Sequence, residues 1–269
     1  MKHYLASALL AAAVLAAATS SARAAPGSIA EAYEVLRQGT WIDLTHAVNA
    51  DIPRFGTFPA LQREAPYTLE KDGFLVYQST FVTQYGTHLD APSHFVAGRR
   101  SLEQIEVREL MLPLVVINKE EEVRRNPDYI LSREDVLEWE RQHGDIAPGS
   151  FVAFATGWSR RWGQEDFSNA DAQGVPHTPG WSIEALEHVL KVRGATAVGH
   201  ETFDTDAAAD VARNGFFASE KFVLSQDKYQ LELMNNLTSL PATGGIIVIG
   251  VPRFEGYPGF PVRAFAIVP

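Results

Sequence analysis

Seven short segments of strand-forming composition most constrain how this chain can fold. They are WIDLTH (41–46), FLVYQSTFVTQ (74–84), PLVVIN (113–118), SFVAFAT (150–156), ATAVGH (195–200), GIIVIGVP (245–252) and AFAIVP (264–269). Several of them are continuous apolar runs, which is typical of strands buried on both faces of a mixed sheet. An exposed meander would instead alternate apolar and polar residues.

Three further segments carry helix start and stop signals. SIAEAYEVLRQG (28–39) opens with Ser28 and Glu31 in capping-box spacing. SREDVLEWERQHG (132–144) and SIEALEHVLKVRG (182–194) each open at a serine and end at a glycine. Three helices for about seven strands argue against a regular alternating βα barrel. The pattern favours a β-rich α/β fold, a mixed sheet with helices packed on its outside.

The first 24 residues are predicted to be a signal peptide rather than part of the fold. A basic start at Lys2 precedes an apolar run from Leu5 to Ala18, and Ala22-Arg23-Ala24 forms a small-x-small cleavage site. The run is shorter than the roughly 20 residues that a membrane-spanning helix needs. A buried N-terminal helix is the alternative. We therefore expect residues 25–269 to form a single domain of a periplasmic or secreted protein.

Charge and cysteine content exclude several classes of function. The net charge of −10 argues against nucleic-acid binding, which needs clustered Lys and Arg. The sequence contains no amphipathic basic helix that would suggest membrane attachment. The chain has no cysteine, which excludes a structural thiolate zinc site and a cysteine nucleophile. A Gly-x-Ser-x-Gly motif is also absent, so the nucleophile of any hydrolase should be water.

The stretch QYGTHLDAPSHF (84–95) concentrates polar groups in a chain with only eight histidines. Gln84, His88, Asp90 and His94 all fall on even positions, so in extended backbone their side chains point to one face. Pro92 ends regular pairing, and His94 is therefore expected on a loop just past the strand. Such a face is costly to bury unless something binds there.

Imidazole and carboxylate groups together suit Zn²⁺ or Mn²⁺. A protein that supplies only part of the coordination sphere leaves room for water, whose pKa a metal lowers. A nearby histidine that is not a ligand can then transfer a proton. The alternative is a strand end whose polar groups hydrogen-bond to neighbouring loops.

The same stretch resembles the HxGTHxDxPxHF signature of the cyclase/amidohydrolase family that includes bacterial kynurenine formamidases and isatin hydrolases. IDLTH (42–46), PLVVI (113–117), FATGW (154–158), TPGWSIEALEHVL (178–190) and the segments from GGIIVIGVPRF to PVRAFAIVP agree with it. The resemblance implies a swivelling β/β/α fold, a homodimer or higher homo-oligomer, and metal-assisted hydrolysis of an amide or lactam attached to an aromatic ring. It implies that His88 and Asp90 are metal ligands and that His94 is the catalytic acid–base.

Two departures from the family pattern affect the metal. Gln84 replaces the first histidine of the signature; its neutral oxygen can ligate a metal, and favours Mn²⁺ over Zn²⁺. Two-metal members also use a histidine and a glutamate near the last helix. The matching segment, ASEKFVLSQDKYQLELMNNL, has no histidine, and Asn235 stands at the glutamate position. We therefore predict one divalent ion, Mn²⁺ or Zn²⁺.

Other candidates for the site follow the remaining strands. His200 and Glu201 end a buried apolar strand, where His200 either completes the coordination sphere, faces the substrate or pairs with nearby acids, and Glu201 is a candidate for substrate binding. His46 ends DLTH and either lines the pocket or has a structural role. Aromatic residues that stack on a substrate or pack in the core are Phe55, Phe58, Trp158, Trp162 and Trp181.

The sequence thus predicts a metal-dependent hydrolase of a cyclic or aryl N-acyl amide, with His94 as proton carrier. Two alternatives stay open. One is a periplasmic protein that only binds an aromatic acid, because the metal site has decayed with Gln84. The other is a cyclase or dehydratase of a polyketide-like compound.

Overall fold

The computed structural model describes residues 27–269, which fall into two compact units divided after Gln38. The first contains helix α1 (Ile29–Gln38), and its capping box forms as predicted: the Ser28 backbone N–H donates to Glu31, and the Glu31 backbone N–H donates to the Ser28 hydroxyl. The second unit begins at Gly39 and contains every other element. The predicted signal peptide lies outside the described residues.

A nine-stranded mixed sheet organises the second unit, in the order β1-β13-β11-β5-β7-β9-β10-β4-β12. The four central strands β5, β7, β9 and β10 are parallel, and all the other pairs are antiparallel. The bounds are β1 (Thr40–Asp43), β4 (His88–Asp90), β5 (Met111–Asn118), β7 (Phe151–Ala155), β9 (Ala197–His200), β10 (Tyr229–Glu232), β11 (Gly245–Gly250), β12 (Gly259–Pro261) and β13 (Arg263–Val268).

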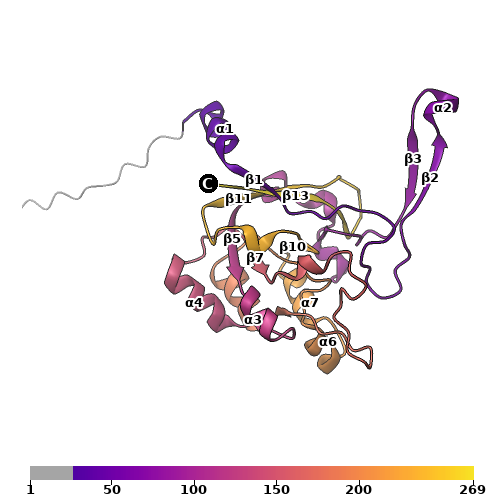
Figure 1. Ribbon diagram of the computed structural model, residues 1–269. Helices are drawn as coiled ribbons and strands as arrows, with labels where there is room; N and C mark the ends of the chain where they lie inside the picture. Colours follow the sequence, from indigo (N-terminus) through magenta and orange to yellow (C-terminus); the bar gives the residue numbers. More distant parts are fainter. Residues whose placement is uncertain (1–26) are drawn as a thin grey trace, which may run out of the picture. The chain divides into compact units, whose positions relative to one another are not determined.

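Two hydrophobic cores lie on the two faces of this sheet. One core joins residues from strands at both ends of the sheet order, such as Leu89 of β4 and Ala266 of β13, so the sheet curls around it. The other core joins Phe154 of β7 to helices on the opposite face, such as Trp139 and Leu186. The predicted fold class, a mixed sheet with outer helices, is therefore confirmed (Figure 1).

The helices begin at the predicted signals. Helix α4 (Arg133–His143) has a complete capping box at Ser132, and α5 (Ile183–Glu187) starts at the Ser182 cap and continues as a π-helical turn, η5 (His188–Val192). The other helices are α2 (Leu69–Asp72), α3 (Glu120–Arg125), α6 (Ala208–Asn214) and α7 (Ala218–Ser225), with 3₁₀ turns η1 (Pro92–His94), η2 (Leu102–Gln104), η3 (Val107–Leu110), η4 (Trp158–Arg161) and η6 (Leu237–Ser239). Among residues 27–269, none of the helices combines the length and apolarity needed to cross a bilayer.

Two small ribbons complete the unit. Strands β6 (Ile130–Leu131) and β8 (Gly180–Trp181) pair in parallel, and β2 (Gln62–Tyr67) and β3 (Val76–Thr80) pair antiparallel. The predicted strand at 74–84 therefore forms only β3, outside the large sheet, and the chain then loops into β4.

Candidate metal centre

Strands β4 and β10 build the floor of the site. His88 and Asp90 are alternate residues of β4, so both side chains lie on one face of the sheet. Glu232 of β10 pairs directly with His88 in the antiparallel register, and Gln230 pairs with Asp90. Three potential ligands therefore converge through the pleat of two short neighbouring strands.

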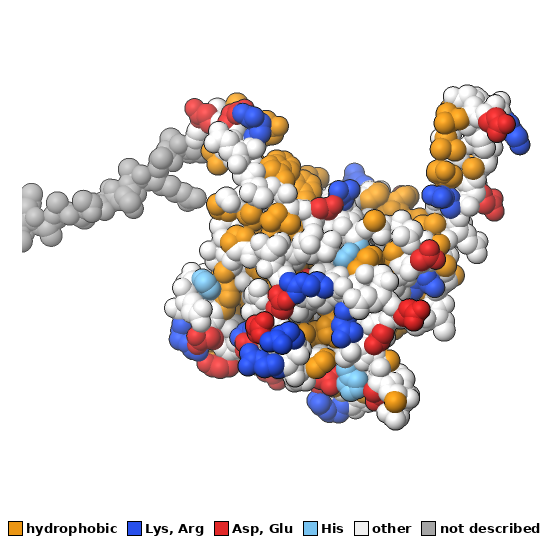
Figure 2. All heavy atoms as spheres, viewed as in Figure 1, with side chains coloured by type: hydrophobic (Ala, Val, Ile, Leu, Met, Phe, Trp, Pro, Cys, Tyr) orange, Lys and Arg blue, Asp and Glu red, His pale blue; other side chains and the backbone are white. Residues whose placement is uncertain are grey.

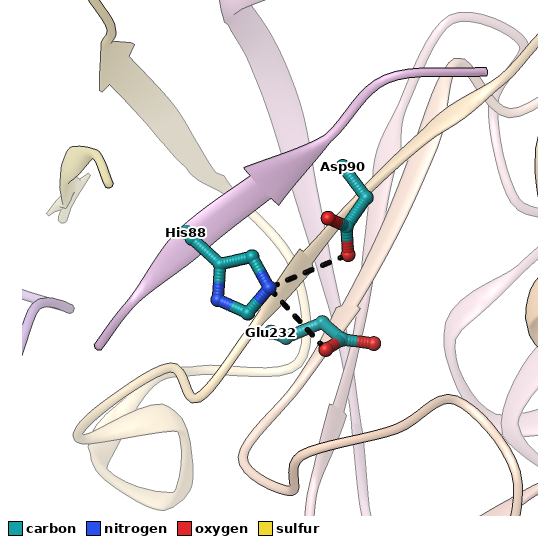
Figure 3. A group of neighbouring side chains, drawn as sticks. All are labelled: His88, Asp90 and Glu232. Carbon is teal, nitrogen blue, oxygen red and sulfur yellow. Dashed lines mark ion pairs between the residues drawn. The ribbon is translucent and has the colours of Figure 1, made fainter. Parts of the chain in front are cut away.

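The imidazole of His88 points between two carboxylates (Figure 3). Its Nε2 lies 3.5 Å from Asp90 Oδ2 and 3.5 Å from Glu232 Oε2. Its Nδ1 lies 2.8 Å from the carbonyl oxygen of Gly86, which is the usual way in which a protein fixes the tautomer of a metal-binding histidine. Nε2 itself is buried without a hydrogen-bond partner among the described residues.

A second group of possible ligands shares Asp90 with the first. His94 follows β4 on η1, and its Nε2 lies 4.0 Å from Asp90 Oδ1 and 3.8 Å from Glu220 Oε1 of α7. Possible ligands therefore form two sets of three residues. In each set, one possible ligand atom per residue lies within 4.8 Å of the other two. The sets are His88–Asp90–Glu232 and Asp90–His94–Glu220. His94 is the most accessible of these groups, with 28% of its side chain exposed.

The site contains more carboxyl groups than groups that can carry a positive charge. Burial raises the pKa of Glu232 well above its ordinary value, and the negative charges of Glu220 and Asp90 raise it further. Burial also raises the pKa of Asp204 to about 7. Burial lowers the pKa of His88, but the charge of Asp90, its hydrogen bond, the Gly86 carbonyl and the charge of Asp204 together outweigh burial and leave that pKa raised. Clustered buried carboxylates beside an orphaned imidazole nitrogen fit a divalent cation, which would offset their charge.

An apolar cavity of about 220 Å³ opens above this floor. Its walls include an aromatic cluster of Phe55, Phe58, Phe95, Phe203 and Phe217, and its polar lining includes Gln84, His88, His94, Asp204, Glu220 and Glu232. Phe55 meets Phe58, Phe203 and Phe217 edge to face. A small flat molecule would therefore be held by aromatic contacts against the polar floor.

Gln84 lines the cavity, but the structure does not bring its oxygen to the centre. Its Nε2 donates to Asp90 Oδ1 over 3.2 Å, and its Oε1 accepts a hydrogen bond from the Thr83 hydroxyl. Gln230 acts in the same way, since its Nε2 donates to Asp90 and Glu232 while its Oε1 accepts from Thr205. Both amides orient the carboxylates.

His200 is buried next to Glu232. Its Nε2 lies 3.4 Å from Glu232 Oε1, whereas His88 lies near the other oxygen of that carboxylate, Oε2. Burial lowers the pKa of His200 to about 3. The sequence left open whether His200 faces the substrate; it does not line the cavity.

Three predicted substrate-binding residues lie elsewhere. His46 stacks on Trp162 at 3.9 Å between ring centroids. Trp158 is buried in the helix-side core and donates from Nε1 to the carbonyl of Phe167. Glu201 uses both carboxylate oxygens to accept hydrogen bonds from Thr156, Gly157 and Ser159. None of these three side chains is among the residues that line the cavity, and each one makes contacts within the fold.

Comparisons with known proteins show the family and the fold of the chain. The profile of the family described as putative cyclase matches residues 42–207. An isatin hydrolase of Roseibium aggregatum is 33% identical over 189 residues, which are 68% of this chain and 71% of that protein. Isatin hydrolase A from Labrenzia aggregata, bound to benzyl benzoate, superposes with a TM-score of 0.83 at 28% identity, over 90% of this chain and 99% of that one. An isatin hydrolase bound to the product analogue thioisatinate gives 0.83 at 27%, over 90% and 100%.

Proposed function

The chain belongs to the putative cyclase family, and from that premise we propose that it is a metal-dependent hydrolase of a C–N bond in a small aromatic amide or lactam. One observation carries the proposal: His88, Asp90 and Glu232 converge under an aromatic-walled cavity that His94 also lines. The similarity to isatin hydrolases along two thirds of the chain supports the choice of bond.

The first group of ligands, His88, Asp90 and Glu232, would hold one divalent ion, Mn²⁺ or Zn²⁺, because one imidazole and two carboxylates accept either metal. The bound ion would polarise a carbonyl and lower the pKa of water. We assign it to this group because the assignment leaves His94 free for proton transfer.

The residues of this chain would divide the remaining work. Phe55, Phe203 and Phe217 would pack against the aromatic ring of the substrate and keep bulk water from the floor. His94 Nε2 lies 4.0 Å from Asp90 Oδ1 and 3.8 Å from Glu220 Oε1, so this nitrogen faces the carboxylates of the site. His94 would take a proton from attacking water and return it to the leaving nitrogen, as general acid–base catalysis requires.

Substitution of His94 tests this assignment. His94→Ala should lower kcat/KM on a panel of aryl formamides and lactams by roughly 10²- to 10⁴-fold, while bound metal stays unchanged. His143→Ala, on the exposed face of α4, is the matched control. Full activity of the His94 variant would remove it from the mechanism. Metal-loaded protein that binds aromatic acids tightly and hydrolyses nothing in the panel would favour a binding protein instead.

A further inference from the structure

A second cavity, of about 470 Å³, lies beside the cavity of the metal centre. Phe55 contacts Phe203 and Phe217 edge to face, with ring centroids 6.4 Å and 6.0 Å apart, so these three rings form a common wall. We call the cavity above the metal centre the inner cavity and its neighbour the outer cavity. The two cavities share five lining residues: Arg54, Phe55, Phe203, Asp204 and Phe217.

The inner cavity alone is small for a substrate pocket. Its volume is about 220 Å³, whereas pockets for small molecules usually enclose roughly 300–1,000 Å³. The outer cavity brings the combined volume into this range. A molecule whose amide lies at the metal centre therefore has space to extend past the common wall.

Helix α6 forms one wall of the outer cavity. Ala208, Val211 and Ala212 line the cavity, and their spacing of three and four residues places them on one face of the helix. An amphipathic helix usually packs such a face into the core, but no residue of α6 is buried. The helix lies at the surface of the unit, where Figure 2 shows charged and hydrophobic side chains together. Its apolar face therefore borders the outer cavity, and the two small alanine side chains make that cavity wide.

The opposite wall is a loop whose shape is fixed by hydrogen bonds. The Ser168 carbonyl accepts from the backbone N–H of His177, and the Thr178 carbonyl accepts from the N–H of Ala208, each over 3.1 Å. His177 Nδ1 lies 2.7 Å from Asp128 Oδ2, which connects the loop to the segment before β6. The outer cavity thus lies between two fixed walls, as ligand pockets usually do. Four residues of the loop line it: Ser168, Gly174, Pro176 and Thr178.

We propose that the outer cavity is a second subsite of the substrate pocket, and that the substrate is an aromatic amide with a second apolar group, such as a phenyl ring, seated between α6 and the loop 168–178. This rests on the proposed function, which places the amide at the metal centre. Among the described residues that line the outer cavity, Arg54 and Asp204 of the common wall are the only charged ones. An ionic group deeper in the outer cavity would have no partner, so an apolar group fits best.

Titration calorimetry of the Mn²⁺-loaded protein with benzoate and the three isomeric phenylbenzoates tests the subsite. These acids are not hydrolysed, so their binding does not depend on turnover. We expect at least one phenylbenzoate to bind roughly 10- to 100-fold more tightly than benzoate, because its second ring is removed from water in the outer cavity.

Filling the outer cavity should remove this preference. Ala208→Leu with Ala212→Leu adds bulk on the cavity face of α6 and keeps good helix formers. The ratio of the two dissociation constants should then approach one. Ala30→Leu with Ala32→Leu makes the same change at exposed positions of α1 and should keep the wild-type ratio. Circular dichroism checks folding, and Ala212→Leu alone, which should lower the ratio partly, is the milder variant.

Thiol labelling locates the second ring independently of affinity. The chain has no cysteine, so Ala212→Cys carries a single thiol beside the outer cavity. At saturating ligand, the tightest phenylbenzoate should slow the reaction of this thiol with a maleimide, and benzoate should not. The labelling of Ala32→Cys on α1 should respond to neither acid.

Two results would overturn the subsite. Every phenylbenzoate could bind no more tightly than benzoate, or the filled variant could keep the wild-type ratio, which would place the second ring outside the outer cavity. Turnover of formanilide and its phenyl derivatives separates this proposal from the proposed function. Hydrolysis without any preference for the phenyl derivatives would remove the subsite and leave the hydrolase. A binding preference that filling removes, together with no hydrolysis, would instead remove the hydrolase and leave the subsite to a binding protein.

Discussion

At the scale of single residues, local spacing predicted three of the five residues that form the two groups of possible ligands. His88, Asp90 and His94 lie together because alternation in β4 and the turn at Pro92 are short-range consequences of the sequence. Glu232 was missed, since the sequence does not reveal that β10 pairs with β4. One signal was available: in Tyr229–Glu232, two residues buried in the curled core alternate with two polar ones, which is a strand pattern.

We expect Glu232 to be as necessary for metal binding as His88 and Asp90, the two ligands that the motif predicts. Glu232→Gln removes one charged oxygen and leaves a neutral amide facing His88 and His200. Titration calorimetry with Mn²⁺ should show a loss larger than the roughly 10- to 100-fold that removing an outer-shell partner costs. Glu165→Gln, on an exposed loop, should bind as the wild type does. Equal affinity in both variants would exclude Glu232 as a ligand.

His46 should make stability depend on pH. Burial lowers its pKa from 6.5 to about 4. Above pH 6.5 the ring is neutral in both states, and its full contribution to stability is present. Between pH 6.5 and 4 the unfolded chain binds a proton that the folded chain refuses, so stability falls as pH falls. We expect a loss of about 1–3 kcal/mol over this range.

The comparison with His46→Phe isolates this effect, because phenylalanine keeps a ring against Trp162 and does not titrate. Urea unfolding of both proteins from pH 7 to pH 4 gives the difference in unfolding free energy at each pH, and constant packing costs cancel. A difference that does not change with pH would contradict the assignment of a neutral buried ring.

At the scale of elements, long apolar runs were predictable and short strands were not. The segments at 113–118 and 150–156 form β5 and β7, because strands buried on both faces need continuous apolar sequence. β4 and β12 have three residues each, and their pairing depends on distant neighbours rather than on their own composition. The centre lies on these short strands, so its full ligand set could not be read from the sequence alone.

Close packing of β12 on β4 should be necessary for the position of Asp90. A Cβ added at Gly259 would lie 2.4 Å from the carbonyl oxygen of Leu89 and 3.1 Å from Asp90 Oδ1. Gly259→Ala must push the strands apart, and we expect a loss of about 1–3 kcal/mol in unfolding free energy together with weaker Mn²⁺ binding. Gly250→Ala is the matched control in β11, where the nearest atom is 3.5 Å away. If both variants unfold at the same urea concentration, the close contact does not matter.

At the scale of the whole molecule, the fold brings negative charge from four elements to one place. Asp90 comes from β4, Glu232 from β10, Glu220 from α7 and Asp204 from the loop after β9. A chain without disulfides has to hold these like charges together by packing alone, unless a cation offsets them. The acidic composition argued against nucleic-acid binding, but the sequence could not show that the acids gather in one place, because this depends on the sheet order β9-β10-β4.

Removal of metal should therefore destabilise the entire second unit. An ion present at 100 times its dissociation constant adds about 2.7 kcal/mol to the folded state. For a domain of this size, each kcal/mol shifts the melting temperature by roughly 2–4 °C, so treatment with a chelator should lower it by about 5–10 °C. Calorimetric scans before chelation, after chelation, and after return of Mn²⁺ or Zn²⁺ measure the shift and show which ion restores the melting temperature.

Glu232→Gln should melt near the temperature of the chelated wild type and respond little to added metal, since its site is already incomplete. Equal melting temperatures for the wild type with and without metal would mean that packing alone tolerates the gathered carboxylates.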